Sequence, residues 1–512
     1  MRKNNTVIGS AALVMIVVIL SKMLGFLRQT AIAYSYGSNL DTDIYFLSSD
    51  FMISLSGALL ASLTTALVTV YIDVTTKKSR NDANKVASTM LTLFLLLGGV
   101  LILLINLFTP WIARILAPSY TTEAHNTLVD FLRIFSVTFV FTSLQSIYAA
   151  VLNANNTFVP GKLYGIIYNP IAIFMVLMFA AKWGINALIV AYFLGNICQT
   201  ILLGIWARKT YSYKPSFDFR DPTIKHLIFL SMPLLLSNIF IQLNGIIDKM
   251  ICSMLGEGIA SNYSYAYTLE QFITATITAT LSLILLSKYA TYVSHGNTEM
   301  VVKTFKESLS GLLILLVPIT IVACVMSPEI VEIVYVRGKF DEVAAYHTSH
   351  ALIGFAVGFG LIAVREMYIR LHFAYQDTKM PMIANIAAVF LNAVLSFVLA
   401  RYIGVLGVSL ATSLSVVLTI ILLNRSVKKY IPGFRFSAMG TLLVKLTIAG
   451  AVTTGSALLL KQMIHTGPIV AFILCAAAAM LVYTLVLLLV RCKELTALLA
   501  NIRDTLQRKT VK

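Results

Sequence analysis

Fourteen long apolar runs are the feature that most limits how this chain folds. About 20 consecutive apolar residues are enough for a helix to cross a bilayer. The runs lie at approximately 7–34, 44–72, 86–108, 128–152, 163–181, 185–207, 224–255, 262–293, 305–326, 344–374, 382–400, 403–423, 441–460 and 468–490. Charged residues make up only 12% of the 512, against about 25% in soluble proteins. The sequence therefore predicts an all-α polytopic membrane protein with 14 transmembrane helices.

The distribution of Lys and Arg predicts the orientation of these helices. The segments on the side of the N-terminus hold about 26 of these residues, and the segments on the opposite side hold about six. Because Lys and Arg are enriched in cytoplasmic loops, we expect both termini to be cytoplasmic and the protein to lie in the cytoplasmic membrane. This asymmetry also accounts for the net charge of +17 without nucleic acid, since no basic-aromatic module is present.

An internal repeat divides the first twelve spans into two halves. Three pairs of markers lie 219 to 221 residues apart: Gly37 and Gly256, the turns ending at Pro160 and Pro381, and Gly184 and Gly404. Six spans per half is an even number, so the halves run the same way through the membrane, as in transporters with parallel repeats. We expect pseudo-symmetric six-helix lobes at 1–215 and 216–430, a C-terminal helix pair at 431–490 and an amphipathic cytoplasmic tail at 491–512.

Positive side chains inside the predicted spans are the first candidates for function. Lys22 and Arg28 lie on either side of Gly25 near the end of the first span. A cation in the centre of a bilayer costs roughly 3 kcal/mol, so such residues usually face protein or a watery cavity. We interpret the two as lining a central cavity that takes an anionic substrate. The alternative is that they lie near a membrane face and extend to lipid headgroups.

Three other arginines inside the predicted spans differ in whether an Asp or Glu lies at helical spacing from them. Arg133 follows Asp130 by three residues and Arg370 follows Glu366 by four, so we expect each to pair along its own helix. Arg365 has no acid at helical spacing, because its neighbour Glu366 is expected to point elsewhere. Arg365 is therefore a further candidate for substrate binding.

Five stretches of the chain, taken in order, resemble one known family. They are SKMLGFLRQTAIAYSYGSNLDTDIYF at 21–46, VLNANNTFVPGKLYGIIYN at 151–169, IDKMICSMLGEGIASNYSYAYTL at 247–269, VYVRGKFD at 334–341 and RLHFAYQDTKMP at 370–381. The chain is thereby similar to the MurJ (MviN) family of lipid II flippases, within the multidrug/oligosaccharidyl-lipid/polysaccharide exporter superfamily. The resemblance implies a flippase that moves an undecaprenyl-pyrophosphate-linked saccharide by alternating access, with basic residues of a central cavity holding the pyrophosphate.

Several residues match the family's functional positions and others depart from them. Arg28 and Asp43 match, and Lys22 stands where the family usually has Arg. The departures are Gln29 for an Asp, Ser56-Gly57 for a tandem Arg, and Thr268 for another Arg. These departures leave lipid II and other polyprenyl-linked glycans as rival substrates.

A sodium ion is the one cofactor that the sequence suggests. The resemblance implies a sodium site in the second lobe, which Asp248, Asn392 and Thr412 match, while Ser396 replaces an Asp. Their oxygens suit a small hard cation, although from the residues alone polar contacts between helices are the favoured explanation.

Other classes of protein are less consistent with the sequence. A cation-coupled multidrug exporter of the same superfamily is the main alternative, but it favours an acidic or apolar cavity. A membrane glycosyltransferase, polymerase or ligase needs a sizeable outer domain with a convergent acid or His, and no such domain is present, so we expect no enzyme. A scaffold without transport stays open. The expected partners are the membrane, a lipid-linked oligosaccharide and the cell-wall or polysaccharide synthesis machinery.

Overall fold

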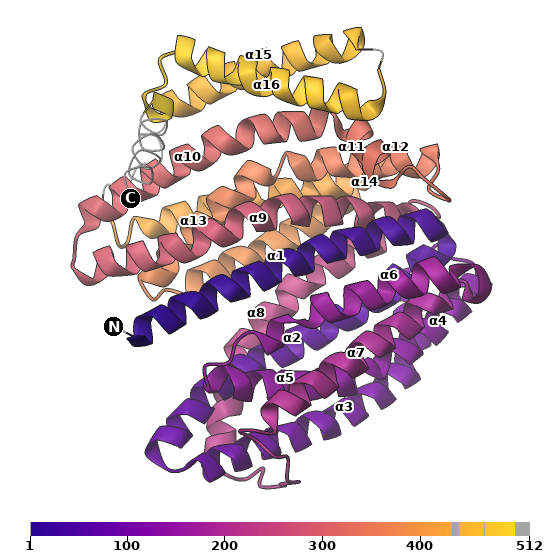
Figure 1. Ribbon diagram of the computed structural model, residues 1–512, viewed down its shortest axis with the longest axis vertical. Coiled ribbons are helices and arrows are strands. Elements are labelled where there is room, and N and C mark those ends of the chain that lie inside the picture. Colours follow the sequence, from indigo (N-terminus) through magenta and orange to yellow (C-terminus); the bar gives the residue numbers. More distant parts are fainter. Residues whose placement is uncertain (1, 433–439, 465, 497–512) are drawn as a thin grey trace. The chain divides into compact units, whose positions relative to one another are not determined.

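The computed structural model describes residues 2–432, 440–464 and 466–496, and every regular element within them is a helix (Figure 1). The helices are α1 (Arg2–Tyr36), α2 (Leu40–Lys77), α3 (Arg80–Leu116), α4 (Thr122–Ser136), α5 (Thr138–Ala154), the 3₁₀ turn η1 (Pro160–Lys162), α6 (Tyr164–Trp183), α7 (Asn186–Ala207), α8 (Pro222–Ser253), α9 (Ile259–Ser294), α10 (Thr298–Val325), α11 (Ser327–Tyr335), α12 (Glu342–Ala356), α13 (Phe359–Ala374), α14 (Lys379–Val427), α15 (Gly440–Met463) and α16 (Pro468–Leu489). The predicted all-α polytopic fold is confirmed. The predicted tail at 491–512 lies outside the described residues from 497 onward.

The lengths of the helices are consistent with the fourteen predicted spans. In the described part of the chain, eleven helical segments are long and apolar enough to cross a membrane, and the bent pair α12 and α13 makes a twelfth. The long α14 contains two spans, because Ile403 and Gly404 interrupt it with non-helical backbone. The remaining predicted span falls on α9, which is 36 residues long.

The internal repeat is visible in the backbone as well as in the sequence. The broken span α4–α5 covers Thr122–Ala154, and its counterpart α12–α13 covers Glu342–Ala374, 220 residues later. The turns after these spans each contain a non-glycine residue with φ of +59°, Asn156 in the first and Gln376 in the second. Gly184 and Gly404 likewise share a positive φ, of +53° and +59°. The two halves therefore repeat unusual backbone conformations in one register.

Capping residues fix where the helices begin. Asn39 and Thr42 form a capping box at the start of α2, in which each side chain accepts the other's backbone N–H, at 3.0 and 2.9 Å. Asp221 caps α8 and accepts from Thr223 N at 2.7 Å, with Pro222 at the first helical position. Such caps satisfy backbone donors that a helix start leaves unpaired, so these turns end and begin helices at defined residues.

The chain forms two compact units, each with its own core. The first unit comprises 1–264 and 337–344, and the second comprises 265–336 and 345–512. α8 thus belongs to the first unit, and the division at 264/265 falls inside the continuous helix α9. The lobe boundaries at 215 and 430 follow the sequence repeat and stay a prediction.

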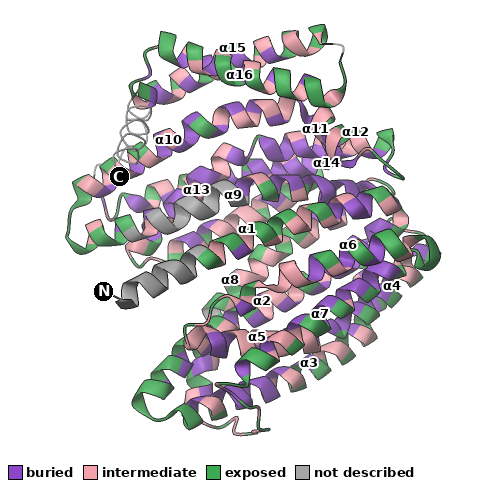
Figure 2. Ribbon diagram, in the orientation of Figure 1, coloured by how far each residue is buried: buried purple, intermediate pink, exposed green. Residues whose placement is uncertain are grey.

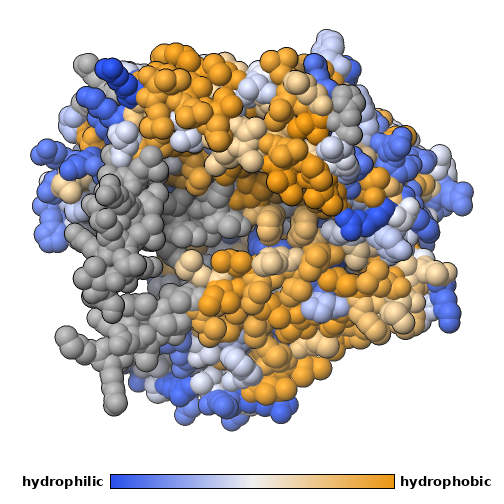
Figure 3. Space-filling model, turned by 45° about the horizontal axis from the view of Figure 1, so that its top comes forward, coloured by the Kyte–Doolittle hydropathy of each residue, from blue (hydrophilic) through white to orange (hydrophobic). Residues whose placement is uncertain are grey.

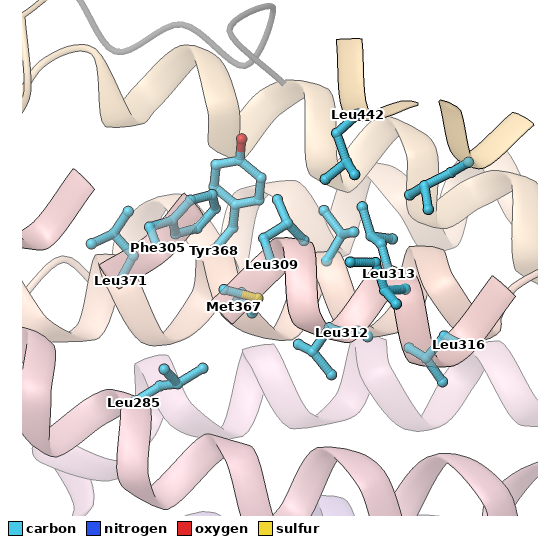
Figure 4. Close-up of a cluster of buried hydrophobic side chains, with 14 of the residues drawn as sticks. Leu285, Phe305, Leu309, Leu312, Leu313, Leu316, Met367, Tyr368, Leu371 and Leu442 are labelled. Carbon is cyan, nitrogen blue, oxygen red and sulfur yellow. The ribbon is translucent and has the colours of Figure 1, made fainter. Parts of the chain in front are cut away.

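Buried apolar side chains fill the interior of each unit. In the first unit, α2, α3, α5 and the start of α8 contribute side chains to one cluster, and Figure 2 shows buried residues along these helices. In the second unit, α9, α10, α13 and α15 meet in a cluster that Figure 4 shows at close range. Its labelled members are Leu285, Phe305, Leu309, Leu312, Leu313, Leu316, Met367, Tyr368, Leu371 and Leu442.

Large apolar side chains also cover much of the surface. Figure 3 shows them in orange over broad areas of the face in view. On α3, Leu103, Leu107 and Trp111 are each about 70% exposed, and their spacing of four residues places them in one stripe. A soluble monomer rarely exposes such contiguous apolar surface. The chain is therefore a multi-pass membrane protein whose outward stripes face lipid.

The C-terminal helix pair is attached to the rest of the second unit by lysine contacts and packing. α15 packs on α16, and Lys461 near the end of α15 lies 2.8 Å from Glu329 of α11 and donates to the carbonyl of Val325 at 2.9 Å. Within the pair, Lys445 donates to the carbonyl of Arg491 at 2.8 Å. Lys461 thus has a carboxylate as partner, whereas Lys445 is bound by a backbone carbonyl.

Candidate functional site

Arg28 lies on the face of a tyrosine ring. Its guanidinium carbon is 5.0 Å from the centroid of Tyr168 on α6. The Nε atom of Arg28 is buried and has no hydrogen-bond partner, and no Asp or Glu forms an ion pair with Arg28 among the residues described. The arrangement therefore holds a half-buried positive charge by cation–π contact and leaves it without a neutralising acid.

Close packing of α1 on α6 places Arg28 there. Asn169 of α6 donates to the carbonyl of Ser21 at 3.1 Å. A Cβ atom at Gly165 would lie 1.7 Å from the Ser21 hydroxyl, so the two helices approach only because residue 165 is a glycine. Gly25, between the predicted cations, faces Asn169. The sequence thus positions Arg28 with small residues on both helices.

A cluster of aromatic rings surrounds this contact. Tyr168 stacks on Tyr164 at 5.4 Å between centroids and meets Tyr192 of α7 edge-on at 5.6 Å. The hydroxyls of Tyr168 and Tyr45 of α2 are hydrogen-bonded at 3.2 Å. Asn196 donates to the Tyr164 hydroxyl at 3.3 Å. Arg28 is thus set against side chains from three other helices, a feature that spacing along the sequence did not indicate.

Lys22 is not placed in this cluster. It is exposed on α1, and it precedes Arg28 by six residues, which corresponds to roughly 9 Å along the helix and a different face. Its predicted role beside Arg28 is therefore not supported by a shared contact and stays a prediction.

Asp43 is buried and serves as a cap for α9. Its Oδ2 accepts from Gly258 N at 2.7 Å and from the Tyr120 hydroxyl at 3.2 Å. Its Oδ1 accepts from the backbone N and the hydroxyl of Ser261, at 2.6 and 2.5 Å. A carboxylate at a helix N-terminus is stabilised by these N–H donors and by the helix dipole. Asp43 therefore joins α2 to the first turn of α9, and it does not pair with Arg28.

The C-terminal end of α1 meets the segment 337–344 of the same unit. Lys339 N donates to the carbonyl of Tyr34 at 2.9 Å, and a Cβ atom at Gly37 would lie 2.4 Å from the carbonyl oxygen of Lys339. Gly338 has φ of +65°, and a Cβ atom there would lie 2.3 Å from the Tyr34 carbonyl oxygen. Backbone runs against backbone at this point, which only glycine permits.

In the second unit, Arg365 has a partner that the sequence argument excluded. Its Nη2 lies 3.1 Å from Oε1 of Glu366, and Arg370 Nη2 lies 3.4 Å from Oε2 of the same carboxylate. The expectation that Glu366 points away from Arg365 was wrong, because both side chains are long enough to bend toward each other around the helix. The Arg370–Glu366 pair is confirmed, whereas Arg133 is exposed and forms no ion pair with Asp130 in the described part of the chain. Substrate binding by Arg365 stays a prediction.

The predicted sodium ligands belong to different units of the chain. Asn392 donates to the Thr412 hydroxyl at 3.0 Å and accepts from Ser396 at 3.1 Å, so two of the three lie together in the second unit. Asp248 belongs to the first unit, where its carboxylate accepts from the Tyr263 hydroxyl at 3.0 Å. A sodium site therefore stays a prediction.

An ion pair between α2 and α8 was not predicted from the sequence. Lys249 of α8 is buried and forms a salt bridge with Asp50 of α2, and its ammonium lies 5.8 Å from the centroid of Phe46. The two charges are 199 residues apart, so no local spacing links them. The available signal was that each is an ionisable residue inside a predicted span, which makes a mutual partner the default expectation.

Comparison with known proteins matches most of the chain to one family. The family model described as lipid II flippase MurJ covers residues 32–478. A probable lipid II flippase MurJ of Bdellovibrio bacteriovorus is 25% identical over 400 residues, which cover 76% of each chain. A probable lipid II flippase MurJ of Rickettsia prowazekii is 26% identical over 357 residues, which cover 68% of this chain and 70% of that protein.

Solved structures show the same fold. A lipid II flippase MurJ in an inward closed conformation matches with a TM-score of 0.80 at 22% identity, covering 93% of this chain and 98% of that one. An inward-facing multidrug resistance MATE family transporter of the MOP superfamily matches with a TM-score of 0.69 at 12% identity, covering 80% and 96%.

Proposed function

The chain belongs to the MurJ lipid II flippase family, and from that premise we propose that it moves an undecaprenyl-pyrophosphate-linked saccharide, lipid II or a related glycan precursor, from the inner to the outer leaflet of the cytoplasmic membrane. The observation that carries the proposal is the Arg28 guanidinium, which is held on Tyr168 without an acid to neutralise it. A pyrophosphate supplies the missing negative charge and acceptor oxygens that suit a guanidinium.

Transport proceeds by alternating access, with the polar headgroup inside the protein and the polyprenyl chain in lipid. The contacts of Lys339 with Tyr34 and of Asp43 with the start of α9 hold the C-terminal end of α1 and the start of α2 in one arrangement. The contacts consist of few hydrogen bonds. They are the ones that break when the protein opens at the C-terminal end of α1. No covalent chemistry is required, so the protein acts as a transporter and not as an enzyme.

Energy for the movement comes from the membrane potential or from sodium. Each elementary charge that crosses the membrane couples to the potential by about 2.3 kcal/mol per 100 mV. Sodium would be held by Asp248, Asn392 and Thr412, whose carboxylate, amide and hydroxyl oxygens suit a hard cation. Both termini face the cytoplasm, as the excess of Lys and Arg on that side indicates, and the cell-wall or polysaccharide synthesis machinery supplies and consumes the lipid.

The test is flipping of a fluorescent polyprenyl-pyrophosphate saccharide in proteoliposomes. Arg28→Ala removes one charge-assisted contact to phosphate, worth about 1.5–3 kcal/mol, so we expect transport to fall about 10- to 100-fold. Arg133→Ala, at an exposed arginine of the same unit without an acidic partner, is the matched control and should transport like the wild type. Full transport by Arg28→Ala would remove this residue from the mechanism.

A cation-coupled multidrug exporter is the second candidate, favoured by the shared fold with the MATE transporter. Exporters of cations suit an acidic or apolar cavity, and Arg28 disfavours such substrates. Uptake of a cationic dye that depends on an ion gradient, without any flipping of the labelled lipid, would select this candidate instead.

A further inference from the structure

The ring of Tyr168 is held more firmly than the arginine that lies on it. Tyr168 is 3% exposed, and rings from its own helix and from α7 pack on it, Tyr164 at 5.4 Å and Tyr192 at 5.6 Å. Phe135 of α4 extends the cluster by meeting Tyr192 at 5.2 Å. Since buried aromatic side chains in such contacts have few alternative rotamers, the Tyr168 face is a fixed surface.

The side chain of Arg28, by contrast, has no carboxylate to fix its orientation. A guanidinium has five N–H donors, and the Nε–H of Arg28 meets no acceptor among the described residues. Its direction is set by contact with the Tyr168 face, at 5.0 Å. The ring therefore decides which of the remaining donors point away from the protein.

The hydroxyl groups of Tyr45 and Tyr168 together have one more proton than the protein acceptors around them bind. Tyr45 and Tyr168 share one hydrogen bond of 3.2 Å, which consumes one of their two hydroxyl protons. The second proton is donated to no protein acceptor within the described residues. The hydroxyl pair therefore holds the ring, and the guanidinium on that ring, with no acid beside it, suits the acceptor oxygens of an anion such as a phosphoryl group.

We propose that Tyr168 and Tyr45 are positioning residues for the anion site: Tyr168 orients the Arg28 guanidinium through its ring, and the hydrogen bond between the Tyr45 and Tyr168 hydroxyls holds that ring in place. The inference rests on the proposed function, because it names how that site takes pyrophosphate. The competing explanation is that the tyrosines only fill the core of the first unit.

The experiment measures binding of inorganic pyrophosphate to the full-length protein in nanodiscs by calorimetry. Tyr168→Leu removes the ring and should weaken binding about 10- to 30-fold, which is the size of a desolvated cation–π contact. Tyr168→Phe keeps the ring and loses only the hydroxyl, so binding should weaken about 3- to 10-fold.

A matched control tests whether any buried tyrosine has this effect. Tyr71, also on α2, is 2% exposed, and its hydroxyl donates to Asn84 at 2.6 Å. It follows Tyr45 by 26 residues, roughly 39 Å along the helix. Tyr71→Phe should bind pyrophosphate within twofold of the wild type.

Repeating both Tyr168 substitutions in an Arg28→Ala background separates positioning from core packing. If the ring acts through Arg28, neither substitution weakens pyrophosphate binding further once Arg28 is gone. If Tyr168→Leu does not accumulate as folded protein, the Tyr168→Phe cycle decides alone. Equal effects of Tyr168 substitution with and without Arg28, or binding by Tyr168→Phe and Tyr168→Leu at wild-type strength, would overturn the inference.

The binding assay tests the positioning role, and the flipping assay tests the proposed function, so each claim can be refuted without the other. Pyrophosphate binding that follows the expected pattern without any lipid flipping would refute the proposed function and leave the positioning role intact. Flipping that requires Arg28 but shows an unchanged KM in Tyr168→Leu would refute the positioning role and leave the proposed function intact.

Discussion

Breaking the Lys249–Asp50 ion pair should destabilise the protein by an amount that depends on which partner is removed. The Lys249 side chain is 11% exposed and that of Asp50 is 37% exposed. Removing one partner of a buried ion pair costs about 3–5 kcal/mol when the other is left without solvent. Asp50→Asn leaves the buried ammonium unpaired, so we expect a loss of about 3 kcal/mol.

Lys249→Met should cost less, because the carboxylate that it leaves behind is more than one third exposed. Exposure reduces the penalty toward that of a surface charge, about 1 kcal/mol. The double variant removes both charges and should be more stable than Asp50→Asn alone, which gives a coupling energy of about 2 kcal/mol in a double-mutant cycle. The asymmetry follows from the difference in exposure together with hydration of the exposed carboxylate, and it needs no assumption about transport.

Denaturant unfolding of the purified protein in mixed micelles, followed by tryptophan fluorescence, gives the four free energies of the cycle. The exposed pair Lys77–Asp73, at 2.8 Å and with side chains 73% and 54% exposed, is the control. Its cycle should give a coupling energy below about 0.5 kcal/mol. Additive effects at Lys249 and Asp50, or a larger loss for Lys249→Met than for Asp50→Asn, would refute the reasoning.

Four further outcomes are expected. Gly338→Ala should lower the melting temperature more than Gly184→Ala, because both have positive φ but only Gly338 has backbone within 3 Å of the added Cβ; equal losses would contradict this. Asp43→Asn should cost about 1–3 kcal/mol by weakening the cap of α9, and a melting temperature equal to that of the wild type would argue against the cap. Replacing potassium by sodium should raise the melting temperature of the wild type but not of Asn392→Ala, and identical responses would remove the sodium site. Burial opposes ionisation of Asp377, but hydrogen bonds to its carboxylate outweigh burial and lower the pKa of Asp377. The ionised carboxylate therefore stabilises the protein at neutral pH, and this stabilisation is lost as the pH falls below about 4. In unfolding curves measured over a pH series, Asp377→Asn should not show this part of the loss of stability in acid.

The fold was largely predictable because the bilayer leaves few choices for an apolar chain. Each long apolar run became a helix, and the glycines that marked the repeat proved to be places where the backbone needs a positive φ, as at Gly184 and Gly404. The interruption within the segment 379–427 was likewise expected, because the apolar runs 382–400 and 403–423 are separate. Local sequence carries such information because it concerns the conformation of single residues.

The partners of the charged side chains were less predictable. The sequence indicated that Arg28 and Asp43 matter, but not that one lies on a tyrosine while the other caps α9. Asp50 and Lys249 meet only after α2 and α8 pack together, and Glu366 reaches Arg365 by bending of flexible side chains. These contacts depend on tertiary packing, which no spacing along one helix records.

The turns at Asn156 and Gln376 give this protein an internal reference. They have the same φ of +59° in the same place of each half, but different side chains in the residues around them. An experimenter who alters one turn can therefore compare it with its twin in the same molecule, bilayer and preparation. Differences between the copies then report on the surroundings of each turn, since the peptide geometry is common to both.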